Sequence, residues 1–375
     1  MMVFLFICIT LVYLFLIGIL ALGFDKVKDF YLEDIPSNTR FSIIIPFRNE
    51  AKNLPSLLLS LKELQYSKDL FEVIFVDDAS TDNSLAIVNT FISQTTLNIT
   101  TIKNNRETNA PKKEAITSAI LLAKNEWIVT TDADCKLPKF WLDTFDAYIQ
   151  KNKPAFIVAP VTYDAADSFL KRFQLLDFLS LQGATIGGFG MRKPFLCNGA
   201  NLTYKKTLFE SVNGFHGNTN IASGDDIFML EKVLNKNPES VHYLKNQKAI
   251  VSTTAEETIK GLISQRVRWA SKTAVSKNKI TKSIGFAILL MNTSIISLFV
   301  LSIIGSFSFK IFLYLFIIKL SIDFLLLYKT ARFFKQEALL SSYVLCSILY
   351  PFFSVYIVFV SVFTGYKWKG RTFSK

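Results

Sequence analysis

The chain has 375 residues, 50% of them hydrophobic, and its formal net charge is +12. This length allows one large domain together with membrane segments, and a basic balance suits either nucleic acid or an anionic membrane surface. The four cysteines have no CxxC spacing and there are only two histidines, which argues against a zinc site, a disulfide framework or histidine-based catalysis. The sequence also contains no HExxH, GxSxG or Walker motif.

The N-terminal segment, residues 2–24, is uncharged and long enough to span a bilayer. A cleaved signal peptide is the alternative, but it would place positive residues before the apolar run. Here Lys26 and Lys28 follow the run instead. The positive-inside rule then places the N-terminus outside and the following domain in the cytosol. We therefore expect a transmembrane helix over residues 1–25.

From residue 40 onward, short apolar runs alternate with segments of helical spacing. The runs predict strands at "FSIIIPF", "FEVIFVDDAS", "LNITTI" and "NEWIVTTDADC". The segments between them predict helices at "NLPSLLLSLKEL", "TDNSLAIVNTFIS" and "APKKEAITSAILLAK". This alternation predicts an α/β domain over residues 40–255 with a Rossmann-like, mostly parallel sheet covered on both faces. Ligands bind such sheets at the carboxyl ends of the strands.

Two acidic clusters follow predicted strands at their carboxyl ends: Asp77 with Asp78, and Asp132 with Asp134. An Asp-x-Asp pair alone is often only a solvated turn, but two clusters at strand ends favour a binding site. Carboxylates there can hold a cation such as Mg²⁺, which completes its shell with phosphate oxygens and water and neutralises a departing diphosphate. Asp78 can instead accept hydrogen bonds from a ribose or a base.

Two lysines, Lys112 and Lys113, lie near the start of a predicted helix of the same sheet. They can add positive charge beside a diphosphate, or they can be the solvated start of a helix. Both interpretations remain open.

A third acidic cluster is "GDDIFML", in which Gly224, Asp225 and Asp226 precede an apolar helix. Asp is ordinary as a helix N-cap, so capping explains one of these acids. The functional alternative is a general base, because a carboxylate beside apolar residues and other acids tends to have a raised pKa.

A basic amphipathic helix is predicted over residues 256–282, just before an apolar region. It suits the membrane interface. The motif "QRVRW" on this helix allows a sharper hypothesis, in which Gln265, Arg268 and Trp269 form part of an active site at the membrane surface. Arg would contact phosphate and Trp would stack on a sugar ring.

Residues 284–364 form a predicted C-terminal transmembrane region, and 365–375 form a basic tail. Two helices, 284–305 and 311–328, are joined by a tight polar turn, and the next loop, "KTARFFK", is basic as a cytosolic loop should be. The last apolar stretch is interrupted by Pro351. A simple crossing would place the tail outside, whereas a re-entrant pair broken at the proline would keep it inside.

These motifs, in this order, resemble membrane-bound glycosyltransferase family 2, which has the GT-A fold. The matching pieces are "IIIPFRNEAKNL", "VIFVDDASTD", "DAD", "NGANLTYKKTLF", "GDDIFML" and "QRVRW". The resemblance covers about residues 40 to 275, and the flanking apolar segments fit as well. The QxxRW pattern is similar to that of polysaccharide synthases and ceramide-glucosyltransferase-like enzymes.

The resemblance implies a role for each matching residue. Donor-binding residues are expected at Pro46, Glu50, Asp77, Asp78, Lys112, Lys113 and Asp132, with Asp77 or Asp78 contacting the uridine part of the donor. Asp132 and Asp134 match the DxD pair that holds diphosphate through Mg²⁺ or Mn²⁺. Asp226 matches the catalytic Asp of the usual Glu-Asp motif, with Asp225 in place of the Glu. Gln265, Arg268 and Trp269 match QxxRW.

The implied reaction is an inverting transfer from a nucleotide-diphosphate sugar, with UDP-sugar the expected donor, at the cytosolic face of a cell inner membrane. The acceptor is a lipid or a growing polysaccharide, and the few apolar segments favour the lipid. The alternatives are a subunit of a processive synthase and a non-catalytic nucleotide-sugar-binding protein. A nucleic-acid partner is discounted, because the basic residues gather beside the membrane segments.

The stretch "GGFGMRKPFLCNGANL" is predicted to be flexible because of Gly187, Gly188 and Gly190. It is either a plain surface loop or an acceptor gate whose aromatic residues touch lipid.

Overall fold

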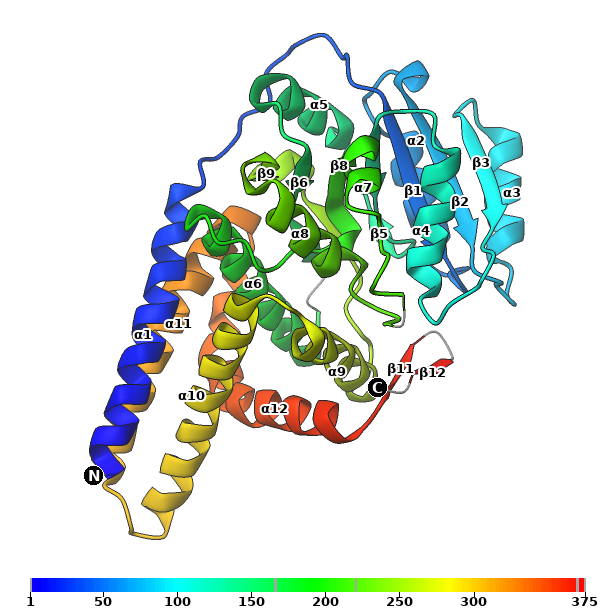
Figure 1. The fold of residues 1–375 in the computed structure, drawn as a ribbon. Helices are drawn as coiled ribbons and strands as arrows, with labels where there is room; N and C mark the ends of the chain where they lie inside the picture. Colours follow the sequence, from blue (N-terminus) through cyan, green and yellow to red (C-terminus); the bar gives the residue numbers. More distant parts are fainter. Residues whose placement is uncertain (1, 165–166, 220, 369–370, 374–375) are drawn as a thin grey trace. The chain divides into compact units, whose positions relative to one another are not determined.

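The computed structural model describes residues 2–164, 167–219, 221–368 and 371–373 (Figure 1). The internal contacts divide the chain into two units. The sheet unit consists of Lys28–Asp164 and Cys197–Thr254. The helical unit consists of Met1–Val27, Ala165–Leu196 and Ala255–Lys375.

The sheet unit is built on a seven-stranded sheet of order β3-β2-β1-β4-β8-β6-β9. The strands are β1 (Phe41–Phe47), β2 (Phe71–Asp77), β3 (Ile99–Lys103), β4 (Trp127–Thr130), β6 (Phe156–Val158), β8 (Leu202–Lys205) and β9 (Val241–Tyr243). The first four strands run parallel to one another, while β8 is antiparallel to both of its neighbours. The prediction of a mostly parallel α/β sheet is therefore confirmed.

Helices and short elements complete the sheet unit. They are α2 (Leu54–Lys62), α3 (Ser84–Gln94), α4 (Pro111–Leu122), α5 (Trp141–Asn152), α7 (Lys206–Ser211), α8 (Asp225–Lys236), the 3₁₀ turns η1 (Lys68–Leu70), η2 (Gly199–Asn201), η3 (Pro238–Ser240) and η4 (Gln247–Ala249), and a small sheet of β5 (Cys135–Lys136), β10 (Val251–Thr253) and β7 (Val161–Tyr163).

Strand β1 shows why the central strands read as continuous apolar runs. Ile43, Ile44 and Ile45 are all fully buried, although successive side chains of a strand point to opposite faces. Both faces of the sheet are therefore covered, as in parallel sheets generally. Helix α4 begins at Pro111, which suits the first helical position because its missing N–H has no partner there.

The helical unit consists mainly of helices, most of which are apolar. They are α1 (Met2–Lys26), α6 (Phe169–Gly190), α9 (Ile259–Val275), α10 (Lys279–Ile303), α11 (Phe309–Phe334) and α12 (Tyr343–Phe363), with the 3₁₀ turn η5 (Glu337–Ser342) and a hairpin of β11 (Tyr366–Trp368) and β12 (Arg371–Phe373). Among the described residues, four helices are long and apolar enough to cross a membrane: α1, α10, α11, and η5 with α12.

Helix α6 corrects one expectation from the sequence. Gly187 and Gly190 lie inside this helix and not in a flexible loop. A Cβ atom on Gly187 would lie 2.4 Å from the carbonyl oxygen of Leu20, and one on Gly190 would lie 1.7 Å from that of Gly23. The glycines therefore let α6 and α1 approach closely, and Phe195, expected to touch lipid, is buried.

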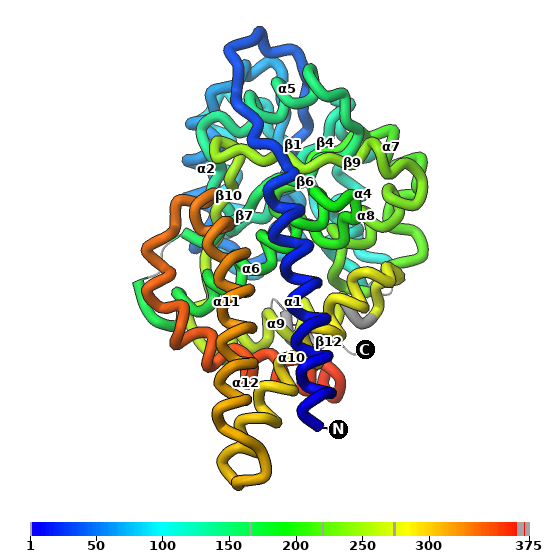
Figure 2. The backbone as a smooth tube through the Cα atoms, turned by 90° about the vertical axis from the view of Figure 1, so that its left-hand side faces the viewer, coloured from blue at the N-terminus to red at the C-terminus, as the bar shows by residue number. Residues whose placement is uncertain are grey.

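Helix α12 runs across the direction of α1, α10 and α11 in both views (Figures 1 and 2). Pro351 lies inside it without breaking it into two helices. Neither sequence alternative for this segment anticipated a single continuous helix lying crosswise.

Candidate active site

The carboxyl ends of four adjacent parallel strands bring distant polar residues to one edge of the sheet. Strands β3, β2, β1 and β4 are neighbours in that order. The chain leaving β2 carries Asp77 and Asp78, and the chain leaving β4 carries Asp132 and Asp134. The chain leaving β3 carries Arg106, which the sequence analysis did not select.

Lys112 is the cation at the centre of this edge. It lies in the first turn of α4, and its Nζ is 2.6 Å from Asp132 Oδ1 and 3.1 Å from Asp225 Oδ2. Burial alone would lower the pKa of Lys112, but the charges of Asp132 and Asp225 outweigh burial and raise it above its ordinary value. The structure thus joins Asp132 and Asp225, which are far apart in sequence, through one lysine.

Gly199, in the turn η2 directly before β8, lies at the same edge of the sheet as Asp132. Because β8 is antiparallel to β4 and pairs Leu202 with Thr130, the 3₁₀ turn before β8 lies beside the end of β4. Gly199 accepts a hydrogen bond from the Thr130 hydroxyl at 3.1 Å. Its N–H donates to Asp226 Oδ2 at 3.3 Å. A Cβ atom on Gly199 would lie 2.8 Å from Asp225 Oδ2, so only glycine leaves this space to the carboxylate.

The two acids of α8 are not its caps. The N-cap is Gly224, whose φ of 86° favours glycine. Asp225 and Asp226 follow as the first two helical residues and are both buried. Acids are favourable in a first turn because of the helix dipole. Their side chains nevertheless have different neighbours, since Asp225 contacts Lys112 and Asp226 contacts Gly199.

Asp78 is held by residues that follow β3. Its Oδ1 accepts from Arg106 Nε at 2.5 Å and from Asn104 Nδ2 at 2.9 Å. Asp77 Oδ1 accepts from the backbone N–H of Ser80 at 2.9 Å. The position of Asn104 and Arg106 at a strand's carboxyl end was the signal that would have identified them.

The remaining donor-binding predictions fall in different surroundings. Pro46 lies in β1 opposite Val76, and Glu50 is buried and accepts a hydrogen bond from Asn53 at 2.7 Å. Lys113 is also buried, at 1% exposure, and its Nζ donates to the carbonyl oxygens of residues 218 and 221 at 2.8 Å each. These contacts give Lys113 a role in holding that loop, and its contact with a donor stays a prediction.

Asp132 and Asp134 follow β4 and are the residues of this edge that could hold a divalent cation. Asp134 Oδ1 lies 3.8 Å from Cys135 Sγ, and burial, then Asp134 and Asp132, raise the pKa of that thiol. Within the described ranges no group of three or more His, Cys, Asp or Glu side chains is assembled for a metal. A Mg²⁺ ion needs only one or two carboxylates when phosphate oxygens complete its shell. The residues present therefore fit such an ion bound together with a diphosphate.

The predicted QxxRW residues belong to the helical unit, on α9. Trp269 stacks under Arg266, whose guanidinium carbon is 4.2 Å from the ring centroid. Arg266 Nε also pairs with Asp177 Oδ2 of α6 at 2.6 Å, and both side chains are 6% exposed. Gln265 donates to Glu256 Oε1 at 3.4 Å, and Arg268 is half-buried. Sequence reasoning selected Arg268 and missed Arg266.

The mostly parallel sheet with its covering helices is an arrangement that the chain shares with a known glycosyltransferase. The chain is similar to mannosyltransferase PcManGT from Pyrobaculum calidifontis, a structure in complex with GDP-Man and Mn²⁺, with a TM-score of 0.58 and 17% identity over 92% of this chain and 95% of that one. Residues 42–212 match Glycosyl transferase family 2. This part of the chain therefore matches the family, and the chain has the GT-A fold.

Curated relatives are similar over shorter stretches. Poly(ribitol-phosphate) beta-N-acetylglucosaminyltransferase TarS of Staphylococcus aureus is 32% identical over 30% of this chain and 19% of its own length. Probable glycosyltransferase YdaM of Bacillus subtilis is 25% identical over 64% of this chain and 56% of its own length. Undecaprenyl-phosphate 4-deoxy-4-formamido-L-arabinose transferase of Pseudomonas fluorescens is 33% identical over 26% of this chain and 28% of its own length. The chain thus spans about a fifth to just over half of the length of these relatives.

Proposed function

We propose that this protein is an inverting glycosyltransferase that moves a sugar from a nucleotide-diphosphate sugar, a UDP-sugar in the first instance, to a membrane lipid or lipid-linked acceptor. One observation carries the proposal: Asp132, Asp225 and Asp226 meet around Lys112 and Gly199 at the carboxyl edge of a family 2 sheet. This is where α/β sheets bind their ligands. A non-catalytic sugar-binding protein would not need all of these carboxylates.

Asp226 is the proposed general base. Its Oδ2 is oriented by the Gly199 N–H, and Oδ1 accepts from the backbone N–H of Ile227 at 2.8 Å. These two bonds fix the plane of the carboxylate while it takes the proton of an acceptor hydroxyl. The hydroxyl oxygen then bonds to the anomeric carbon, and the bond from that carbon to the diphosphate breaks on the opposite face.

Lys112 is the proposed fixed positive charge beside the leaving diphosphate. Its raised pKa keeps it protonated at neutral pH. Asp132 and Asp134 are the residues that would hold Mg²⁺ or Mn²⁺, and a bound divalent ion would supply further charge neutralisation on the diphosphate. Asp77 and Asp78 are the proposed contacts to the nucleoside.

Several observations support a lipid acceptor at the cytosolic face of the membrane. The chain has four helices long and apolar enough to span. The undecaprenyl-phosphate transferase carries a lipid phosphate in its name. Basic residues at 26 and 28, and at 329, 332 and 335, favour a cytosolic domain by the positive-inside rule. The sequence predicted a loop at 329–335, but 329–334 form the last turns of α11. A polymeric acceptor, suggested by the name of TarS, is the alternative.

The decisive experiment supplies the purified protein, in detergent with Mn²⁺, with a panel of nucleotide sugars and measures the nucleoside diphosphate released with and without a membrane lipid extract. We expect release from one donor, increased by the extract. Binding of a donor without any release under either condition would favour the non-catalytic alternative. In a parallel reaction a polysaccharide replaces the lipid extract. Release that the polysaccharide increases and the lipid extract does not would favour the subunit of a processive synthase.

The metal role is tested separately with Asp134→Asn. We expect this variant to keep the melting temperature of the parent and to lose both metal-dependent donor binding and transfer. Full turnover of the variant, or of the parent protein in excess EDTA, would contradict a metal held at this pair.

A further inference from the structure

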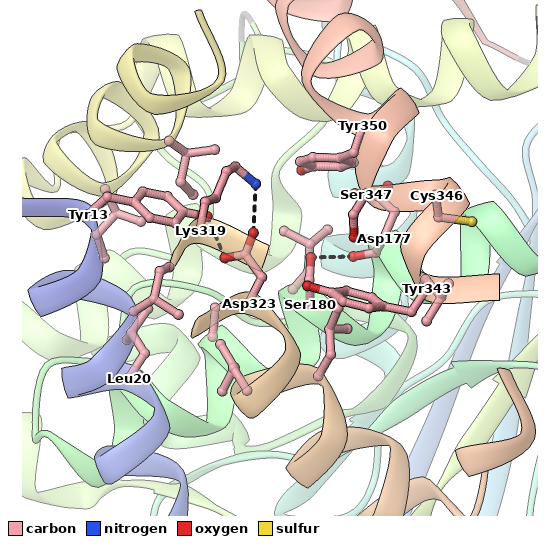
Figure 3. Close-up of a pocket in the computed structure, with 18 of the residues that line it drawn as sticks. Tyr13, Leu20, Asp177, Ser180, Lys319, Asp323, Tyr343, Cys346, Ser347 and Tyr350 are labelled. Carbon is pink, nitrogen blue, oxygen red and sulfur yellow. Dashed lines mark hydrogen bonds and ion pairs between the residues drawn. The ribbon is translucent and has the colours of Figure 1, made fainter. Parts of the chain in front are cut away.

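A cavity of about 120 Å³ lies inside the helical unit, between α1, α6, α10, α11 and α12 (Figure 3). All the residues that line it belong to that unit. One water needs roughly 10–15 Å³ of such volume, so the cavity can accommodate a larger group. Its walls combine aliphatic side chains with an unusual number of polar ones.

One wall carries an ion pair and a tyrosine that is hydrogen-bonded to it. Asp323 and Lys319, four residues apart on α11, form an ion pair of 2.6 Å. The Tyr13 hydroxyl of α1 donates to the other carboxylate oxygen of Asp323 at 2.7 Å. Lys319 and Tyr13 are 3% and 5% exposed. Charged residues inside an apolar helix bundle are costly, and they often mark a binding site or pathway.

The facing wall carries a second acid. Figure 3 shows Asp177 of α6 near Ser347 and Tyr350 of α12, across the cavity from Asp323. Asp177 is already paired with Arg266 at 2.6 Å. Both carboxylates thus have a cationic partner, so the charges of the two pairs balance.

The outer surfaces of the surrounding helices show which molecules can reach the cavity. Large apolar side chains are exposed along α1, α11 and α12, including Phe4, Phe15, Ile317, Phe352 and Phe359. Exposed apolar side chains in this number suit acyl chains rather than water. A ligand that enters the cavity from the acyl chains around these helices is itself a lipid.

We infer that this cavity binds an uncharged lipid through a hydroxyl group, which donates a hydrogen bond to Asp323 or Asp177. Carboxylates accept hydrogen bonds and offer none when ionised. A phosphate would face two acids whose cationic partners are already engaged, and like charges in close contact are repelled strongly. A hydroxyl satisfies the acids without disturbing either ion pair.

This inference goes beyond the proposed function. The hydroxyl held by Asp323 or Asp177 in the helical unit is a different group from the acceptor hydroxyl that Asp226 is proposed to deprotonate, so the lipid bound here is a ligand of the helical unit and is not assigned as the acceptor. Binding itself can be measured without a donor sugar. A failure of lipid binding is therefore distinguishable from a failure of sugar transfer, which the diphosphate-release assay reports.

The test compares two lipids that differ only by a phosphate: dioleoylglycerol and dioleoyl phosphatidic acid. The full chain in phosphatidylcholine nanodiscs is titrated with each, and retained lipid is quantified after gel filtration. We expect dioleoylglycerol to bind at least about tenfold more tightly. Asp323→Asn leaves Lys319 without its acid, so this preference should shrink or reverse. Equal binding by the parent protein, or tighter binding of phosphatidic acid, would overturn the inference.

A second variant covers the case in which Asp323→Asn does not fold. Ala184→Leu adds bulk to the cavity wall on α6 without changing either ion pair, and Ala338→Leu makes the same change at an exposed position of η5 that does not line the cavity. We expect dioleoylglycerol binding to fall severalfold in Ala184→Leu only. Unchanged binding in both variants would show that the cavity is not the lipid site.

Discussion

At the scale of single residues, the environments of Asp225 and Asp226 separate two roles that their adjacency conceals. Asp225 neutralises Lys112, whereas Asp226 is oriented by backbone N–H groups. Neither is the N-cap of α8, because Gly224 occupies that position. A change at either acid should therefore affect chemistry more than helix stability.

We predict that Asp226→Asn transfers sugar at least about a hundredfold more slowly while still binding the donor diphosphate, because a positioned general base contributes about 10²- to 10⁴-fold. Asn is nearly isosteric, so the melting temperature should change little. Single-turnover transfer and donor titration measure the two effects.

The matched control is Asp225→Asn, which should be the milder change. If Asp225→Asn is inactive while Asp226→Asn transfers at a near-normal rate, the base is assigned to the wrong residue. If both variants remain active, neither Asp225 nor Asp226 is the general base of the reaction.

We predict that Gly199→Ala lowers kcat, because a Cβ atom would lie 2.8 Å from Asp225 Oδ2 and must displace that carboxylate from Lys112. The side chain can move, so the fold should survive. Gly18→Ala is the control, since its nearest neighbour would be the Ile322 Cδ1 atom at 4.0 Å. Equal kcat in the two variants would show that the close contact at Gly199 does not position the acids.

At the scale of elements, α9 combines membrane character with a buried ionic contact. Arg266 stacks on Trp269 and pairs with Asp177 of α6, so one face of the helix is fixed to the unit's interior. The exposed part includes Ile259 and Val275. An interfacial helix with one such fixed face can hold side chains in a defined position beside a membrane.

We predict that Trp269→Ala reduces turnover much more than membrane retention, because the apolar helices alone suffice to anchor the protein. Turnover is measured in detergent and retention by carbonate washing of membranes. Val275→Ala, an exposed position on the same helix, is the control and should behave like the parent. Normal turnover in a folded Trp269→Ala protein would leave the tryptophan with a packing role only.

The crosswise direction of α12 predicts that its two ends lie on the same side of the membrane (Figures 1 and 2). Single cysteines at Ser341 and Thr364, both exposed, should react alike with an impermeant thiol reagent in intact cells, in a background without the native cysteines. Reaction of one and protection of the other would show that α12 crosses the bilayer.

At the scale of the whole molecule, charge and apolarity divide between the ends and the middle of the chain. The apolar helices are at both ends, with lysines and arginines beside them. This arrangement suits a membrane protein whose sheet unit lies on the cytosolic side, where nucleotide sugars are expected.

We predict that the chain between Lys26 and Lys282 is cytosolic, by the positive-inside rule. Lys103→Cys, at an exposed strand end, should stay unlabelled by an impermeant reagent in intact cells and become labelled after lysis. Strong labelling before lysis would reverse the topology.

The sequence by itself determined the order of the elements and much of the acidic edge. The run from Phe41 to Phe47 matches β1 at both ends, because a run that is apolar except for Ser42 forms a strand that is buried on both faces. The positions of Asp77 at the end of β2 and of Asp132 just past β4 followed from the same local patterns. Local patterns are visible in sequence because strand periodicity and helix periodicity act over a few residues.

Only the tertiary structure decided which of these residues meet. Lys112 joins Asp132 to Asp225, 93 positions apart by their residue numbers, because β8 returns antiparallel beside β4. Gly187 and Gly190 looked like a flexible loop, yet they are helical because their missing side chains let α6 pack against α1. Such contacts depend on the spatial neighbour and not on the local residue pattern, and this is the physical reason that the sequence alone did not reveal them.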